Sequence, residues 1–255
     1  MNFTLGLDTS SRYAHVAIID HDGNVRAVAS DSENHLSPRE RAGSSGSVIR
    51  LIRDALSSIG IPLSDLSSVA VALGPGSYTG LRTGLGTAFG LRFSSSVPVV
   101  GVSLFVARLL PWLEPERDFI GVLSANERER YLGFYRVEQV QTGDTSFLER
   151  MKSWRMIELA SPAVVEATEV SETVSELFRN LEGENSNRVL QAKTLSIDEA
   201  NLNENPAVLV ARASFVHSQS STATRDTFEA EVARGLAPVY GKAVTAKTLA
   251  ERAGT

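Results

Sequence analysis

The chain contains no cysteine and only four histidines among its 255 residues. Disulfides, thiolate nucleophiles and cysteine-bound metals or clusters are therefore excluded. No two histidines have the spacing of a metal-binding pair, so we interpret all of them as structural or surface residues. These are His15, His21, His35 and His217.

Long apolar runs are also missing, because Arg, Asp or Gly interrupts every apolar stretch well short of a membrane span. The first residues enter a strand pattern directly and show no signal-peptide pattern. With 25 basic and 30 acidic residues, the net charge of −5 argues against broad, nonspecific nucleic-acid binding. We expect a cytoplasmic protein.

The apolar pattern predicts an alternation of strands and helices. Strands are expected at 3–8, 13–20, 25–30, 69–73, 98–102, 119–123, 131–137, 154–159 and 189–191. Helices are expected at 48–59, from the glycine-rich stretch to about 93, and at 103–113, 171–181, 207–216 and 228–236. Asp22-Gly23 is a hairpin signal between the second and third strands. Both halves begin with antiparallel strands and continue into helices, which indicates a duplicated α/β unit.

Six glycines, at 74, 76, 80, 84, 86 and 90, lie between the predicted strand at 69–73 and the end of the following helix. Their spacing fits neither a P-loop nor a nucleophile elbow. Ser77 has no base marked near it in sequence, which leaves little support for a serine protease. What remains is a glycine-rich strand-to-helix turn, whose N–H groups and positive helix end can hold an anion.

The second part of the stretch carries a row of small residues, Gly80, Gly84 and Ala88, on one helical face. Glycine inside a helix costs about 1 kcal/mol relative to alanine, so the row predicts close approach of another backbone. Two alternatives stay open. The row packs inside the chain's own core, or it binds a partner together with the wide apolar stripe of the helix at 48–59.

Several motifs resemble the TsaB (YeaZ) family of the bacterial tRNA threonylcarbamoyladenosine (t6A) pathway. They are Leu5-Gly6-Leu7-Asp8-Thr9-Ser10, Gly74-Pro75-Gly76-Ser77-Tyr78-Thr79-Gly80-Leu81-Arg82, Pro98-Val99-Val100-Gly101-Val102-Ser103, Ala125-Asn126-Glu127 and Pro238-Val239-Tyr240. The similarity is close over residues 1–103 and thin between about 147 and 226. Arg50, Ser124 and Gly241-Lys242 depart from the family pattern.

This resemblance implies an actin/hexokinase/Hsp70-like (ASKHA) fold, with two duplicated α/β subdomains whose mixed sheets are flanked by helices. The corresponding division is an N-terminal subdomain at 1–103 with the partner-binding helices, a smaller and divergent subdomain at 104–224, and a C-terminal helix and tail at 225–255 that packs back on the first subdomain.

The resemblance also implies a non-catalytic scaffold that heterodimerises with TsaD, the catalytic subunit, and contacts tRNA only through the complex. A TsaE-like ATPase is a further expected partner, and a homodimer of the isolated chain stays open. The expected interface consists of Val48, Leu51, Ile52, Ala55, Gly80, Leu81, Gly84 and Ala88.

The alternative is an ASKHA-fold ATP-binding protein or weak ATPase that acts alone. TsaD binds a metal through paired histidines, but Leu104 and Arg108 stand at those positions here and cannot ligate a metal. The chain has no Gly-Gly pair for a second nucleotide loop. We therefore expect no firm cofactor, no bound metal, and at most weak ATP or ADP binding with magnesium. A vestigial phosphate site would comprise Asp8, Thr9, Ser10, Gly74, Gly76 and Ser77, with Asp8 either near magnesium or capping its turn.

Overall fold

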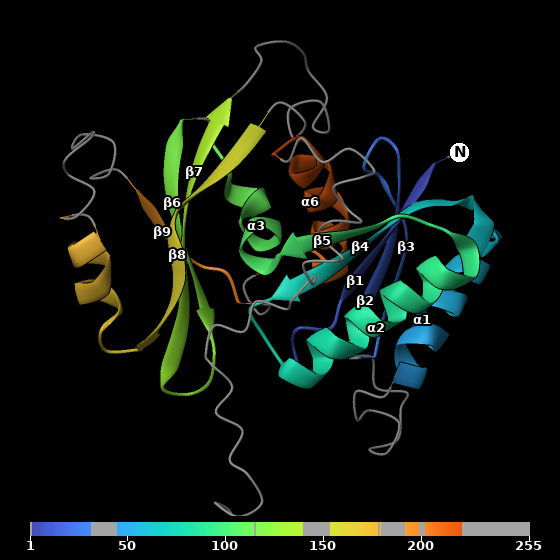
Figure 1. Cartoon of the computed structure of the whole chain (residues 1–255), viewed down its shortest axis with the longest axis horizontal. Helices are drawn as coiled ribbons and strands as arrows, with labels where there is room; N and C mark the ends of the chain where they lie inside the picture. Colours follow the sequence, from blue (N-terminus) through green and yellow to red (C-terminus); the bar gives the residue numbers. More distant parts are fainter. Residues whose placement is uncertain are drawn as a thin grey trace, which may run out of the picture.

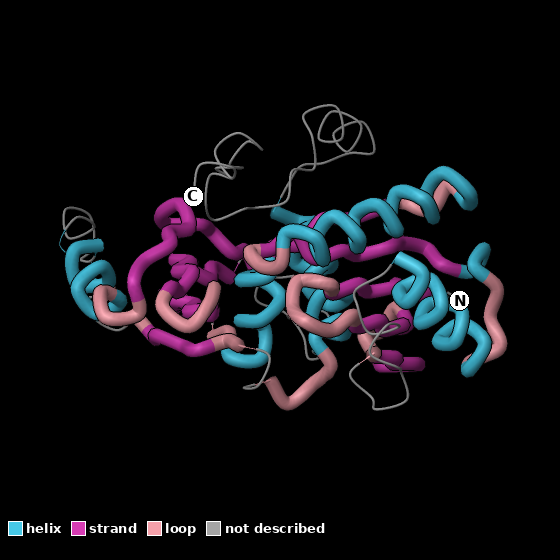
Figure 2. Tube along the Cα trace, turned by 90° about the horizontal axis from the view of Figure 1, so that it is seen from below, coloured by secondary structure: helices cyan, strands magenta, loops and turns pink. Residues whose placement is uncertain are grey.

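A computed structural model describes residues 2–31, 45–114, 116–139, 154–177, 179, 192–198 and 202–220. The strands form two separate sheets, with helices around and between them (Figure 1). The view from below shows the same two groups of strands (Figure 2). This is the α/β architecture with two mixed sheets that the sequence predicts.

The first sheet has the strand order β3-β2-β1-β4-β5. Its strands are β1 (Phe3–Asp8), β2 (His15–Asp20), β3 (Val25–Ser30), β4 (Leu66–Gly74) and β5 (Val99–Ser103). The first three pair antiparallel, whereas β4 lies parallel to β1 and β5 parallel to β4. The predicted Asp22-Gly23 turn joins β2 to β3, and Gly23 has a positive φ of 78° that glycine adopts without strain.

Helices cover both faces of this sheet, which explains why its central strands are apolar on both sides. On one face, Val16 and Ile18 of β2 pack with α1 (Ser45–Ser58), and α2 (Tyr78–Ser95) packs mainly on β4. On the other, the alternating β2 residues pack against α6 (Pro206–Ser220). The approach of α6 is close, because a Cβ built on Gly6 of β1 would lie 2.1 Å from the carbonyl oxygen of Ala207. Gly6 thus allows two backbones to touch.

The second sheet repeats the topology of the first. Its order is β8-β7-β6-β9, formed by β6 (Arg117–Ser124), β7 (Glu129–Gln139), β8 (Trp154–Glu166) and β9 (Lys193–Ser196). β7 pairs antiparallel with β6 and β8, and β9 lies parallel to β6. This is the arrangement of β3-β2-β1-β4, so the predicted duplication is confirmed in the strand order. Helical residues 170–177 pack on its outer face.

A short helix, α3 (Leu104–Leu109), fills the space between the two sheets (Figure 1). Phe105 is fully buried there, and its ring lies against the bare backbone of Gly121 and Gly133 in the second sheet. The predicted helix at 103–113 changes at Leu110 into a 3₁₀ turn, η2 (Leu110–Trp112). Pro111 explains the change, since it lacks the N–H that an α-helix interior requires.

Tyr135 of β7 also lies in the interior between the sheets, with its hydroxyl facing Ser103 and Glu158. Burial raises the pKa of Tyr135 to about 12, the Ser103 hydroxyl opposes that shift, and the Glu158 carboxylate adds to it. Burial likewise raises the pKa of Glu158, and the hydrogen bond from Tyr135 partly offsets this.

Alkali should therefore destabilise the protein through Tyr135. Its phenol ionises near pH 10 in the unfolded chain and near pH 12 in the folded one. In that window the folded state keeps a proton that the unfolded state loses, so the free energy of unfolding falls by about 2–3 kcal/mol as pH rises. Urea unfolding from pH 9 to 12 measures the loss. Tyr135→Phe should lose less, and an equal loss in both proteins would assign the alkali sensitivity to other groups.

Some sequence predictions fall outside the described residues, among them the strand at 189–191, the helix at 228–236 and the C-terminal tail. The boundaries at 103 and 224 remain predictions, although α6, which precedes the second boundary, packs mainly on the first sheet. Within the described ranges, no helix combines the length and apolar character needed to cross a membrane.

Candidate functional site

Two loops of the first half meet at the carboxyl ends of β1 and β4. The backbone N–H of Ser77 donates to the carbonyl of Ser10 at 2.7 Å. Gly76 lies so close that a Cβ built on it would be 2.5 Å from the same oxygen. Gly74, which ends β4, has a positive φ of 104°. The loop that follows Asp8 and the predicted glycine turn therefore form one substructure.

The start of α2 is fixed by the same two loops. Ser77 is the N-cap, and its hydroxyl accepts from the N–H of Gly80 at 3.2 Å. The Thr9 hydroxyl donates to the carbonyl of Gly80 at 2.8 Å. A Cβ on Gly80 would lie 1.9 Å from the carbonyl oxygen of Thr9, and one on Gly84 would lie 2.4 Å from its hydroxyl. These two glycines thus serve close packing within the chain.

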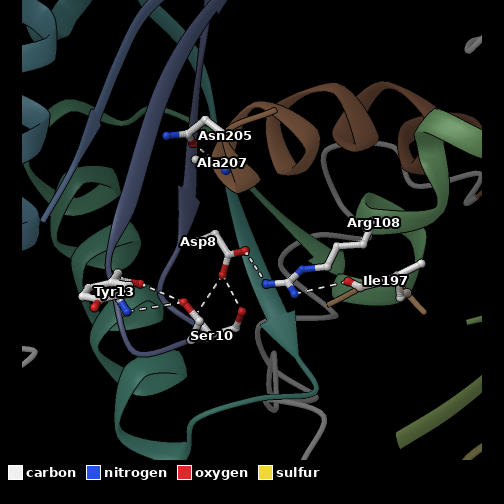
Figure 3. A network of polar contacts seen from close by, with 8 residues as sticks. Asp8, Ser10, Tyr13, Arg108, Ile197, Asn205 and Ala207 are labelled. Carbon is white, nitrogen blue, oxygen red and sulfur yellow. Dashed lines mark hydrogen bonds and ion pairs between the residues drawn. The ribbon is translucent and has the colours of Figure 1, made fainter. Parts of the chain in front are cut away.

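Asp8 is fully buried at the end of β1. One carboxylate oxygen accepts from the N–H of Ser10 at 2.9 Å and from its hydroxyl at 2.5 Å, so Asp8 caps its own turn. The other oxygen lies 3.4 Å from Nη2 of Arg108, which reaches across from α3 (Figure 3). Arg108 Nη1 donates to the carbonyl of Ile197, just after β9, also at 3.4 Å.

A cavity of about 150 Å³ opens beside this ion pair. Its lining comes from both halves and comprises Ser10, Ser11, Pro75, Gly76, Leu104, Arg108, Leu123, Ser124 and Asp198. On the second-half side, Asp198 accepts from the N–H of Ser124 at 2.7 Å and from its hydroxyl at 2.9 Å. The cavity therefore lies in the cleft between the two sheets.

The described part of the cleft offers little room and no free carboxylate for a magnesium-bound nucleotide. The cavity is smaller than the roughly 300–1,000 Å³ of ordinary small-molecule sites. The Asp8 side chain is 1% exposed and is already hydrogen-bonded on one oxygen and ion-paired on the other. Among the described residues, no three His, Asp or Glu side chains gather in a metal-binding group.

Neither of the two histidines whose side chains the structure describes belongs to a metal-binding group. His15 is buried in β2, and His21 is exposed in the turn before β3. His35 and the side chain of His217 fall outside the described residues. Ser77, the serine weighed as a nucleophile, caps α2 instead.

The residues expected at a partner interface are largely buried in the isolated chain. Val48, Leu51, Ile52 and Ala55 of α1 are at most 4% exposed, and they pack on the first sheet. Leu81, Gly84 and Ala88 of α2 are buried as well, and Gly80 lies on Thr9. The wide stripe of α1 is explained by its position, because it packs against both the sheet and α2. These side chains belong to the core of the isolated chain, and their role at a partner interface stays a prediction.

The opposite face of α2 is the open one. Gly86 and Gly90 are exposed, and a Cβ built on either would meet nothing within 4 Å. Phe93 continues the same face with 90% of its surface exposed. On neighbouring α1, Ile49 is 59% exposed. We call Gly86, Gly90, Phe93 and Ile49 the open face of α1 and α2.

Sequence reasoning misses two contributors to the cleft. The sequence shows that Arg108 cannot bind a metal, but its pairing with Asp8, 100 positions away, has no local signal. Asp198 has no local sequence signal either, although its hydrogen-bond partner Ser124 is one of the residues that depart from the family pattern.

The family profile and the curated relatives that match this chain are proteins of tRNA threonylcarbamoyladenosine synthesis. A profile of the TsaD family, tRNA N6-adenosine threonylcarbamoyltransferase, matches residues 41–171. The tRNA threonylcarbamoyladenosine biosynthesis protein TsaB of Escherichia coli is 30% identical over 150 residues, which are 50% of this chain and 61% of that protein. TsaB of Haemophilus influenzae is 26% identical over 155 residues, 60% of each chain. The matched part thus spans about three fifths of these relatives.

Solved structures agree on the fold. YeaZ from Pseudomonas aeruginosa superposes with a TM-score of 0.53 at 20% identity, covering 94% of this chain and 100% of that one. A protein with similarity to peptidase YEAZ, also from Pseudomonas aeruginosa, gives a TM-score of 0.55 at 21% identity, with 95% and 100% covered. With the repeated sheet order, this confirms the predicted ASKHA fold of two related α/β units.

Proposed function

Since the chain belongs to the TsaB (YeaZ) family of tRNA threonylcarbamoyladenosine biosynthesis proteins and shares the TsaD-type domain, we propose that it is a non-catalytic subunit of this pathway. In this role it holds and activates a TsaD-like partner, and that partner transfers the threonylcarbamoyl group to an adenosine in tRNA.

The open face of α1 and α2 carries this proposal. A phenylalanine with 90% of its surface in solvent contributes little to the packing of the described residues. Beside it, Gly86 and Gly90 leave the helix backbone bare, so that another helix can approach closely. A contiguous group of exposed apolar residues is typical of an interaction site, and we propose that Phe93 and Ile49, on two helices that pack against each other, belong to one. We therefore assign the TsaD-like subunit to this face, on the outer side of the two helices that the family resemblance indicates.

The cleft supports the non-catalytic part of the proposal. Its cavity is small, and Asp8 is neutralised by an arginine of the same chain. Neither feature suits the binding and positioning of a nucleotide with its metal. We propose accordingly that tRNA and the reacting groups bind to the partner, that a TsaE-like ATPase joins the complex, and that a homodimer of the isolated chain uses the same open face.

Phe93→Glu should separate binding from folding. A charge at the centre of the proposed contact is expected to weaken association with the TsaD-like subunit of the same organism by at least about thirtyfold, the usual loss at a dominant interface residue. The melting temperature should change little, since the side chain is 90% exposed. Co-purification and calorimetry measure binding, and a thermal melt measures folding.

Val28→Glu is the matched control, because Val28 is 52% exposed on β3, away from the open face. It should leave association intact. In a reconstituted assay with tRNA, the chain alone should yield no modified adenosine, and the Phe93→Glu protein should no longer stimulate the TsaD-like subunit. Full association of Phe93→Glu would refute the assigned face, and modification by the isolated chain would refute the non-catalytic role.

A further inference from the structure

Asp8 is a carboxylate that the fold has removed from water. Its side chain is 1% exposed, and such a charge is costly unless an opposite charge lies beside it. Within the described part of the chain, Arg108 is the cation that forms an ion pair with it. The two Ser10 contacts occupy the other oxygen and supply no positive charge.

Arg108 reaches Asp8 from α3, the helix between the two sheets. Its side chain is 5% exposed, and it lines the cavity between the sheets. One guanidinium nitrogen faces Asp8 of the first half, and another donates to the carbonyl of Ile197 in the second (Figure 3). The guanidinium thus stands between a carboxylate and a backbone carbonyl, two oxygen groups of the kind that hard metal ions bind.

We infer that Arg108 occupies the cation position of this cleft and thereby determines that the cleft does not take a metal-bound ligand. A guanidinium is charged at every physiological pH and cannot act as a metal ligand. While it lies beside Asp8, a divalent cation would have to displace it from a buried position. The carboxylate needed for a metal site is therefore present, and the arginine closes it.

A consequence is that loss of the arginine alone should open the site. Arg108→Ala leaves Asp8 buried without its counter-ion, beside an enlarged cavity that also contains Asp198. Magnesium favours one or two carboxylates completed by water, and this is what the variant would offer.

The experiment is a thermal melt of the full chain with EDTA or with increasing magnesium chloride at constant ionic strength. With EDTA, Arg108→Ala should melt lower than wild type by on the order of 10 °C, the loss expected for a broken buried ion pair in a chain of this size. Magnesium should raise its melting temperature in a saturable manner, because a cation that binds only the folded state stabilises it. The wild-type melting temperature should not respond.

Two variants serve as controls. The double variant Asp8→Asn, Arg108→Leu removes both charges and should regain much of the stability without responding to magnesium. Arg212→Ala removes a guanidinium that pairs with the partly exposed Glu204 and should not respond either.

Arg108→Gln, which loses the charge but keeps a polar side chain, gives the same readout if the alanine variant does not fold. Equal magnesium responses of wild type and Arg108→Ala, or no response of Arg108→Ala and Arg108→Gln, would overturn the inference. The test needs no partner protein, so its result is independent of the proposed function.

Discussion

Phe105→Ala is expected to lower the free energy of unfolding by about 3–5 kcal/mol, the usual loss for a buried phenylalanine. The ring fills the space between the two sheets, where a Cβ on Gly133 would lie 2.7 Å from it. Because a sheet backbone cannot collapse into the space that the ring leaves, a cavity should remain. Urea unfolding at neutral pH measures the loss.

Phe93→Ala is the matched control, since it removes the same atoms from a side chain that is 90% exposed. Its stability should stay within about 0.5 kcal/mol of wild type. A loss at Phe105 no larger than that at Phe93 would mean that α3 does not join the two sheets into one core.

Two alanine substitutions in α2 should act in opposite directions. Gly80→Ala places a methyl group against the carbonyl of Thr9, where its carbon would lie 1.9 Å from the oxygen, so the backbone must move. Overpacking of this kind costs about 1–3 kcal/mol. Gly86→Ala meets nothing within 4 Å and should gain about 1 kcal/mol from the better helix propensity of alanine. Thermal and urea unfolding measure both.

The comparison is internally controlled, because the helix and the substitution are the same. If Gly80→Ala is as stable as wild type, α2 does not pack tightly on the loop after Asp8. If Gly86→Ala lowers stability, that face of α2 is covered by other parts of the chain.

The pattern of strands and helices is largely predictable because its signals are local. All of β1 is buried, and residues 69–72 of β4 form a continuous buried apolar run. The strand predicted at 3–8 agrees with β1 at both ends. The repeat of strand pairs followed by helices predicts the duplication that the two sheet orders show. By contrast, β9 is a four-residue strand with an exposed alternate face, and no clear sequence pattern marks it.

The site is predictable where two loops at the ends of neighbouring parallel strands carry its residues. Ser10 meets Gly76 and Ser77, and Thr9 meets Gly80, as expected of two loops at one edge of a parallel sheet. The direction in which a small-residue row faces is not predictable, because helical spacing alone cannot distinguish a sheet from a partner. The Gly80–Gly84 row faces the Thr9 loop, while Gly86 and Gly90 are open.

The position of α6 has a consequence for how this protein is made. Gly6 lies against Ala207, and the first sheet relies on α6 to cover one of its faces. During synthesis the ribosome releases residues 1–103 long before it releases 206–220. The nascent first half must therefore wait with Ala17 and Ile19 uncovered, the situation in which partly folded chains aggregate. Completion of the fold depends on a contact that spans about 200 positions of the chain, and such long-range closure makes folding slow.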